Sequence, residues 1–327
     1  MRWPADESPC LPARGLTRRP LLGLALLAPL AARAGNALSV VIDPDARVET
    51  LYAEGQWCEG PVWIPALTSL VFSDVRRNRM IRIPDGGRPE PFRDPSENAN
   101  GNTLDAQGRL ITCQHRTGRV VRAEADGAFT VLAERHGTGR LNSPNDVVVA
   151  TDGAVWFTDP TFGISVPSEG EPRASEQAGS FVYRLAPDGT LTAVATNFHE
   201  PNGLAFSPDE RILYVAEAGK GPDGSAQRTI HALDVSDGRL SNERVFARVE
   251  NGIPDGLKVD SDGRVYAGTG DGVRIWNADG APVGRIPTDG PCANIAFGGP
   301  DGRRLYICAG PKVLTVETRV RGAGLRG

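Results

Sequence analysis

The feature that most constrains this chain is a repeat of short apolar segments separated by Asp-Gly turns. One series of turns includes Asp152-Gly153 and Asp262-Gly263, and a second includes Asp126-Gly127 and Asp188-Gly189. Asp-Gly supplies the positive φ that two-residue hairpin turns require. The runs between turns, such as Ile212–Val215, are β-branched and aromatic, which favours strands. The sequence therefore predicts a repeated, hairpin-based β unit.

Each unit carries a polar residue at one place, four residues before the last apolar residue of the strand preceding the first turn. Successive positions are 41, 45, 57, 53 and about 38 residues apart, and four short strands in such a length are typical of a propeller blade. We predict an all-β, six-bladed β-propeller over residues 46–320, with another all-β array, such as two packed sandwiches, as the alternative. The positions are Glu59, Asn100, Asn145, Asn202, Asp255 and, in the sixth unit, Ala293 or Asn294.

The ends of the repeat predict how the ring closes. The last unit has only three strands of its own, ending at Val313–Val316, whereas Val48–Leu51 precedes the first unit as an outer strand. If the N-terminal strand completes blade six, no open edge remains between the first and last blades. The 327 residues, which by length allow two domains, then form one propeller between a linker at 35–45 and a tail at 321–327.

Composition agrees with many turns and excludes several classes of protein. Glycine (39) and proline (26) exceed their average use, which argues against a helical bundle. A net charge of −4 argues against a nucleic-acid partner. Five cysteines without a CxxC pair and only four histidines exclude zinc-finger spacing. The chain also lacks the GxSxG motif of a serine hydrolase.

Residues 1–34 are typical of an export signal. Arg18 and Arg19 precede an apolar run from Leu21 to Ala32, and small residues then supply a cleavage site ending at Ala34. The run is too short to span a bilayer, and the paired arginines indicate the twin-arginine (Tat) machinery. Removing the segment changes the net charge from −4 to −7. We expect a periplasmic or secreted protein with no membrane partner after cleavage; a helical or disordered extension is the alternative.

The repeated polar positions predict a metal site. Inner strands of a propeller surround a central channel, so equivalent positions form a ring, and burying carboxylates and amides there without partners is costly. Their oxygens suit a divalent cation, with Ca²⁺ favoured and Zn²⁺, Mg²⁺ or Mn²⁺ as alternatives. The competing interpretation is that Asn202-Gly203 and Asp255-Gly256 are only turn residues.

Several short motifs contain these positions. In each motif a proline or glycine lies next to the acidic or amide residue. As a set they resemble the gluconolactonase/regucalcin (senescence marker protein) family, over about residues 46–316. That resemblance implies a six-bladed propeller, lactonase activity and one catalytic divalent cation. It implies Glu59, Asn145, Asn202 and Asp255 as the metal ligands. The motifs are Glu59–Trp63, Asn142–Asp146, Pro201–Phe206 and Pro254–Leu257, with Asn100–Asp105 and Trp156–Pro160 matching the bacterial gluconolactonase branch.

The resemblance also implies where substrate binds. Asn100 falls on a substrate-contacting position, although the arginine that regucalcin-like members place two residues earlier is Asn98 here. Asp255 is the predicted general base for the attacking water, with a role as metal ligand only left open. Asn100 and Asn145 are predicted to contact sugar hydroxyls or the oxyanion. His115, just after a strand, is predicted to contact substrate at the channel mouth, or else to lie in a surface loop.

We therefore predict metal-dependent hydrolysis of a sugar lactone. The alternatives are an organophosphate-ester hydrolase on the same metal site and a non-catalytic sugar- or metal-binding propeller.

The segment Ser165–Gly179, the longest between strands, is a predicted lid. Cys292 and Cys308 flank the turn near Pro300 symmetrically, which leaves a disulfide or two buried thiols open.

Overall fold

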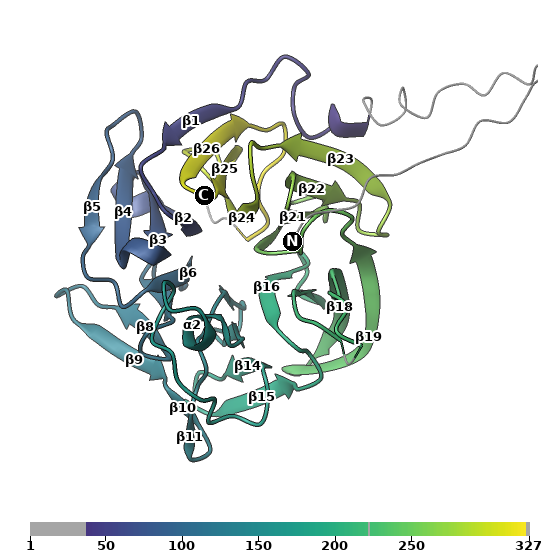
Figure 1. The fold of residues 1–327 in the computed structure, drawn as a ribbon. Coiled ribbons are helices and arrows are strands. Elements are labelled where there is room, and N and C mark those ends of the chain that lie inside the picture. The colour runs from purple at the N-terminus through teal and green to yellow at the C-terminus, as the bar shows by residue number, and fades with distance from the viewer. Residues whose placement is uncertain (1–36, 222, 325–327) are drawn as a thin grey trace, which may run out of the picture.

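The computed structural model describes residues 37–221 and 223–324, and it shows six four-stranded antiparallel sheets arranged as a ring (Figure 1). This confirms the predicted six-bladed β-propeller. The export signal predicted for residues 1–34 lies outside the described residues. Within the described ranges, no helix is long and apolar enough to span a membrane.

Each blade runs from an inner strand at the channel to an outer strand at the rim. Blade one contains β2 (Cys58–Ile64), β3 (Ser69–Asp74), β4 (Arg79–Pro84) and β5 (Glu90–Arg93). Blade two contains β6 (Ala99–Leu104), β7 (Leu110–Gln114), β8 (Arg119–Ala123) and β9 (Phe129–Ala133). Blade three contains β12 (Val147–Val149), β13 (Val155–Asp159), β14 (Phe181–Leu185) and β15 (Leu191–Ala195).

The second half of the ring repeats this order. Blade four contains β16 (Pro201–Phe206), β17 (Ile212–Glu217), β18 (Thr229–Ser236) and β19 (Arg239–Arg248). Blade five contains β20 (Leu257–Val259), β21 (Val265–Thr269), β22 (Gly272–Trp276) and β23 (Pro282–Pro287). Blade six contains β24 (Cys292–Gly298), β25 (Arg304–Ala309), β26 (Lys312–Glu317) and β1 (Glu49–Tyr52). A small hairpin, β10 (Arg135–His136) and β11 (Gly139–Arg140), and a short helix, α2 (Phe162–Ser165), lie in the connections around blade three.

The first and last strands close the ring as predicted. β1 pairs antiparallel with β26, with Glu49 opposite Thr315 and Thr50 opposite Leu314. Because β1 is the outer strand of a blade whose other three strands come from the C-terminal end of the chain, the first and last blades share a sheet (Figure 1).

The described parts of the predicted linker and tail lie against the propeller. Val41 is fully buried against blades five and six, and its carbonyl oxygen accepts a 2.7 Å hydrogen bond from the Arg319 backbone N–H. Gly322 forms a bridge with Asp260 of blade five. The described parts of both segments are therefore packed onto the ring, because apolar residues such as Val41 gain more from burial than from exposure.

Aspartate and glycine form the turns between strands as the sequence indicates. Gly153 has a φ of +86°, and the Asp152 carboxylate accepts a 2.8 Å hydrogen bond from the Ala154 N–H. Two of the glycines that follow the inner polar positions act differently. Gly203 and Gly256 do not have positive φ, and a Cβ on Gly203 would lie 2.2 Å from the Asp255 carbonyl oxygen.

The turn interpretation of Asn202-Gly203 and Asp255-Gly256 is therefore wrong. A Cβ on Gly256 would lie 2.2 Å from the Asn294 side chain of the next blade. Gly203 is required because the backbone of the next blade approaches too closely there for any side chain, whereas a side chain at Gly256 would displace Asn294 of the channel.

The four cysteines in the described part of the chain are free and buried. An irregularity in the β24–β25 pairing sets Cys292 opposite Ala309 and Cys308 opposite Asn294. The two thiols therefore do not face each other across the hairpin, and the disulfide considered from their symmetric spacing is not formed.

Candidate functional site

The inner strands bring together the polar positions that the repeat predicts, and we call them the channel ring. Hydrogen bonds between neighbouring blades fix the backbone at these positions. The Gly101 N–H donates to the Asn145 carbonyl at 2.7 Å, and the Thr158 hydroxyl donates to the Asn202 carbonyl at 2.7 Å. In blade six, Asn294 is the member whose side chain bonds to a ring carboxyl. The channel ring comprises Glu59, Asn100, Asn145, Asn202, Asp255 and Asn294.

Two carboxyl groups in the ring lack a compensating positive charge. Glu59 is only 3% exposed, and burial, followed by repulsion from Asp146, raises its pKa to about 8. Burial, followed by repulsion from Glu59, also raises the pKa of Asp255 well above its usual value. Among residues 37–221 and 223–324, no lysine, arginine or histidine forms an ion pair with either carboxyl.

Amide side chains complete the ring. Asn100, Asn145 and Asn202 are each at most 4% exposed. Asn202 bonds to the Asp255 carboxyl, which partly opposes the rise in the pKa of Asp255. The Oδ1 atom of Asn100 is buried and has no hydrogen-bond partner among the described residues. The ring thus presents amide oxygens beside two carboxyls.

This donor set fits a divalent cation. Ca²⁺ binds carboxylate and amide oxygens together, and a positive charge at the ring would favour the ionised forms of Glu59 and Asp255 that burial now disfavours. In the described ranges, no group of three or more His, Cys, Asp or Glu side chains is arranged to hold a metal. A cation in this channel would therefore depend on the amide oxygens as well as on the two carboxylates.

His115 lies against the ring rather than in an exposed loop. Its side chain is fully buried, with Nε2 at 3.1 Å from Asn100 Nδ2 and 3.4 Å from Asn145 Nδ2. Its Nδ1 lies 3.2 Å from the Glu169 carbonyl oxygen. Burial lowers the pKa of His115 to about 4. Asn98, at the position where the resemblance implies an arginine, donates to the Val75 carbonyl at 2.8 Å.

Two acidic residues near the ring were not predicted. Asp146 is 1% exposed, and its Oδ2 has no partner in the part of the chain that the structure describes. Its place directly after Asn145 in the chain was a usable signal. The Glu169 carboxylate lies near enough to raise the pKa of Asp255, but it belongs to a long connection whose path carries no periodic pattern.

That connection is the predicted lid, Ser165–Gly179, which follows α2. Glu169 pairs with Arg76 of blade one at 2.7 Å, and Arg76 also stacks over Trp57. The Arg173 guanidinium donates to the Asn142 carbonyl at 2.7 Å. The segment is therefore attached to blades one and three and covers His115 between them.

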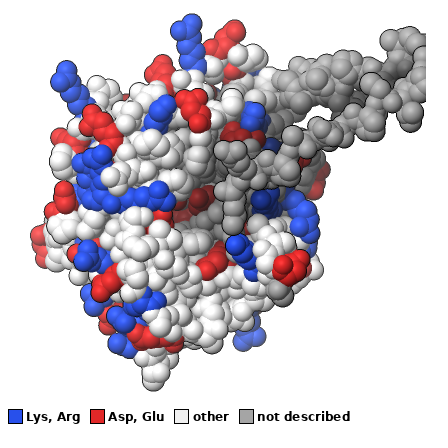
Figure 2. All heavy atoms as spheres, in the orientation of Figure 1, with Lys and Arg blue, Asp and Glu red and all other residues white. Residues whose placement is uncertain are grey.

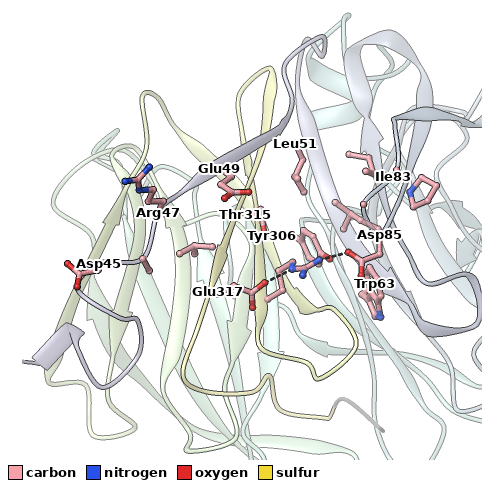
Figure 3. A pocket seen from close by; sticks show the side chains of 17 residues that line it. Asp45, Arg47, Glu49, Leu51, Trp63, Ile83, Asp85, Tyr306, Thr315 and Glu317 are labelled. Atoms are coloured by element: carbon pink, nitrogen blue, oxygen red, sulfur yellow. Dashed lines mark hydrogen bonds and ion pairs between the residues drawn. The ribbon is translucent and has the colours of Figure 1, made fainter.

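A separate pocket of about 660 Å³ lies at the seam between blades six and one (Figure 3). Arg304 pairs there with Asp85 and Glu317, and Trp63 stacks on Tyr306. Because no channel-ring residue lines this pocket, it is not the candidate site. On the face shown in Figure 2, basic and acidic side chains are interspersed, and acidic atoms are visible in the hollow at its centre.

Comparisons with known proteins show that this chain is similar to lactonases in sequence and in fold. The family described as "SMP-30/Gluconolactonase/LRE-like region" matches residues 57–310. A gluconolactonase from Zymomonas mobilis is 30% identical over 311 residues, covering 87% of this chain and 85% of the relative. A pentonolactonase from Haloferax volcanii is 34% identical over 262 residues, covering 76% and 80%. The solved structure of a gluconolactonase from Xanthomonas campestris superposes with a TM-score of 0.80 at 43% identity, covering 86% of this chain and 92% of that one.

Proposed function

Because this chain belongs to the SMP-30/gluconolactonase/LRE-like family, we propose that it is a lactonase that hydrolyses a sugar lactone with a divalent cation in its channel. The observation that carries the proposal is the channel ring, in which the buried Glu59 carboxyl and the partly buried Asp255 carboxyl lie among several amides without a cationic partner among the described residues. The names of its relatives, gluconolactonase and pentonolactonase, support a sugar lactone as substrate.

Glu59, Asn145, Asn202 and Asp255 are the residues that would hold the cation. When bound, a divalent cation polarises a lactone carbonyl and lowers the pKa of water. Ca²⁺ is the ion that the all-oxygen donor set favours.

Asp255 is the proposed general base. Its carboxylate takes a proton from the attacking water as the water oxygen bonds to the carbonyl carbon, and it returns that proton to the ring oxygen as the ring C–O bond breaks. The product is an open-chain hydroxy acid, so atoms and charge balance without a further reactant. The unpartnered Asn100 Oδ1 is placed to accept a hydrogen bond from a sugar hydroxyl.

Proton release from a panel of sugar lactones tests this function. The wild-type protein is treated with EDTA, resupplied with Ca²⁺, Zn²⁺, Mg²⁺ or Mn²⁺, and compared with Glu59→Gln and Asp255→Asn. Asp289→Asn, which alters a carboxylate that is 90% exposed, is the matched control. We expect EDTA and both ring variants to abolish turnover and the control to retain it. Turnover of an organophosphate ester but of no lactone supports the alternative hydrolase, and turnover of neither supports a binding protein.

We also propose that the chain is exported by the Tat machinery to the periplasm or beyond. The proposal is supported by Arg18 and Arg19 before the apolar run. Replacing both arginines with lysine in the full-length chain should retain the protein in the cytoplasm on fractionation. Unchanged export of that variant contradicts the proposed route.

A further inference from the structure

We propose that His115 is a positioning residue that fixes the orientation of the Asn100 and Asn145 amides, so that their oxygens rather than their nitrogens face away from it toward a ligand. This inference rests on the proposed function of the channel ring. Its evidence is geometric: His115 follows β7, its side chain is fully buried, and both of its ring nitrogens have polar neighbours.

The Glu169 carbonyl determines which nitrogen of His115 carries the proton. Nδ1 lies 3.2 Å from that carbonyl oxygen, and a carbonyl oxygen can only accept a hydrogen bond. Nδ1 must therefore be the protonated nitrogen. Nε2 faces the Nδ2 atoms of Asn100 and Asn145, which can only donate, and no carboxylate among the described residues bonds to either nitrogen of His115. Nε2 is therefore an acceptor with a free lone pair.

An acceptor at Nε2 sets the direction of both amides. Asn100 Nδ2 and Asn145 Nδ2 lie 3.1 and 3.4 Å from it, within reach of hydrogen bonds that they donate. The amide group is planar, and its oxygen and nitrogen lie on opposite sides of Cγ. Each Oδ1 atom must therefore face away from His115. A rotated amide would set its oxygen against the Nε2 lone pair, which is repulsive.

The consequences match the roles proposed for the two asparagines. Asn145 turns its oxygen, the only amide atom that can bind a cation, away from His115, and its backbone N–H is held by the Thr158 carbonyl at 2.8 Å. Asn100 is left with a buried Oδ1 that has no partner among the described residues. Burying an oxygen without a hydrogen-bond partner costs folding free energy unless a ligand or water bonds to it. By holding the Nδ2 side of the amide, His115 keeps this oxygen available to a ligand.

The lid contributes through its backbone. Glu169 supplies the carbonyl that His115 contacts, and its carboxylate is held by Arg76 at 2.7 Å. A Cβ on Gly163 of α2 would lie 2.5 Å from the His115 Cβ, so the helix that leads into the lid packs directly on His115. The lid therefore holds His115 in the tautomer that orients the Asn100 and Asn145 amides of the channel ring.

The tautomer is tested on the metal-free protein by ¹⁵N NMR of the imidazoles. The chain has four histidines, and the signals of His115 are those that disappear in His115→Gln. We expect the neutral Nδ1–H form at pH 7. A neutral Nε2–H form or an imidazolium overturns the inference, whatever the protein's activity.

The effect on the ring is tested by calorimetric titration of Ca²⁺ and by steady-state kinetics. His115→Phe preserves ring volume but removes both hydrogen-bonding nitrogens, whereas His115→Gln retains one donor and one acceptor. His199→Phe, at a side chain that is 44% exposed, is the control. We expect His115→Phe to weaken Ca²⁺ binding and lower kcat by about 10- to 100-fold each, and His115→Gln to recover most of both.

The outcomes separate this inference from the proposed function. If His115→Phe folds and keeps both Ca²⁺ affinity and kcat within about twofold of wild type, His115 only fills space and the inference fails. If His115→Phe does not fold, His115→Gln and the tautomer decide. If the wild-type protein neither binds Ca²⁺ nor hydrolyses a lactone, the proposed function fails, while the NMR result still decides whether His115 orients the amides.

Discussion

Replacing Gly203 with alanine should damage both stability and the channel ring. The new Cβ would lie 2.2 Å from the Asp255 carbonyl oxygen, 2.6 Å from the Gly256 Cα and 2.6 Å from the Leu257 nitrogen. All three are backbone atoms, so no side chain can rotate to make room. Since Cβ atoms essentially never lie within 3.0 Å of a non-bonded atom, blades four and five must separate by about 1 Å at this point.

The size of both effects follows from that displacement. Overpacking a well-packed interior costs about 1–3 kcal/mol, and each kcal/mol lowers the Tm of a domain of this size by roughly 2–4 °C. We therefore expect Gly203→Ala to lower the Tm by about 2–12 °C. Asn202 and Asp255 stand directly beside the contact, and a misplacement of about 1 Å in a catalytic arrangement costs about 100-fold in rate.

The assay combines thermal unfolding with kcat/KM on the preferred lactone. The matched control is Gly290→Ala, because Gly290 has no positive φ and a Cβ added there would meet no atom within 4 Å beyond its chain neighbours. We expect the control to match wild type in both measurements. A Gly203→Ala protein with wild-type Tm and kcat/KM would refute the argument that the glycines beside the ring set the distance between blades.

Three further predictions concern pH, the lid and the cation. Burial raises the pKa of Asp159 from 3.8 to about 7, so the folded protein binds more protons than the unfolded chain between these values, and stability falls as pH rises from 4 to 7. Urea unfolding should show Asp159→Asn gaining roughly 3–4 kcal/mol relative to wild type over that window, and a difference independent of pH contradicts it. Arg76→Gln, which removes the ion pair with Glu169, should raise KM for the lactone more than it lowers kcat; equal effects on both would show that the lid does not assist binding. Ca²⁺ at about 100 times its Kd should stabilise the wild-type protein by about 2.7 kcal/mol in denaturant titrations and leave Asp255→Asn unchanged, whereas equal stabilisation of both would place the ion elsewhere.

Periodicity made the fold and most of the ring predictable. Each blade repeats the same hairpins, so the Asp-Gly turns mark the strands, and counting back from each inner strand reaches Glu59, Asn145 and Asp255. The ring residues occupy the same place in each repeat, so repeat spacing alone locates them, although the pairing of β2 and of β16 is irregular at that place. The closure by β1 was predictable for the same reason, because the last unit lacks one strand.

Contacts between units were not predictable. In the sequence, Gly203 resembles a turn residue. Only the structure shows that the backbone of blade five lies so close to Gly203 that a side chain would not fit. Glu169 reaches the ring from a connection without a repeat, and the burial of His115 depends on how that connection folds back. The packing of Val41 on blades five and six likewise depends on surfaces that the segment itself does not encode.

The most direct test of the account is a stoichiometric titration of EDTA-treated protein with Ca²⁺ while the hydrolysis of glucono-1,5-lactone is followed by proton release. We predict that activity is absent without the ion, rises linearly, and stops rising at one equivalent per chain, with no rise in Asp255→Asn. Full activity of the EDTA-treated protein, or an Asp255→Asn protein that responds to Ca²⁺ as the wild type does, would contradict a catalytic cation held by the channel ring.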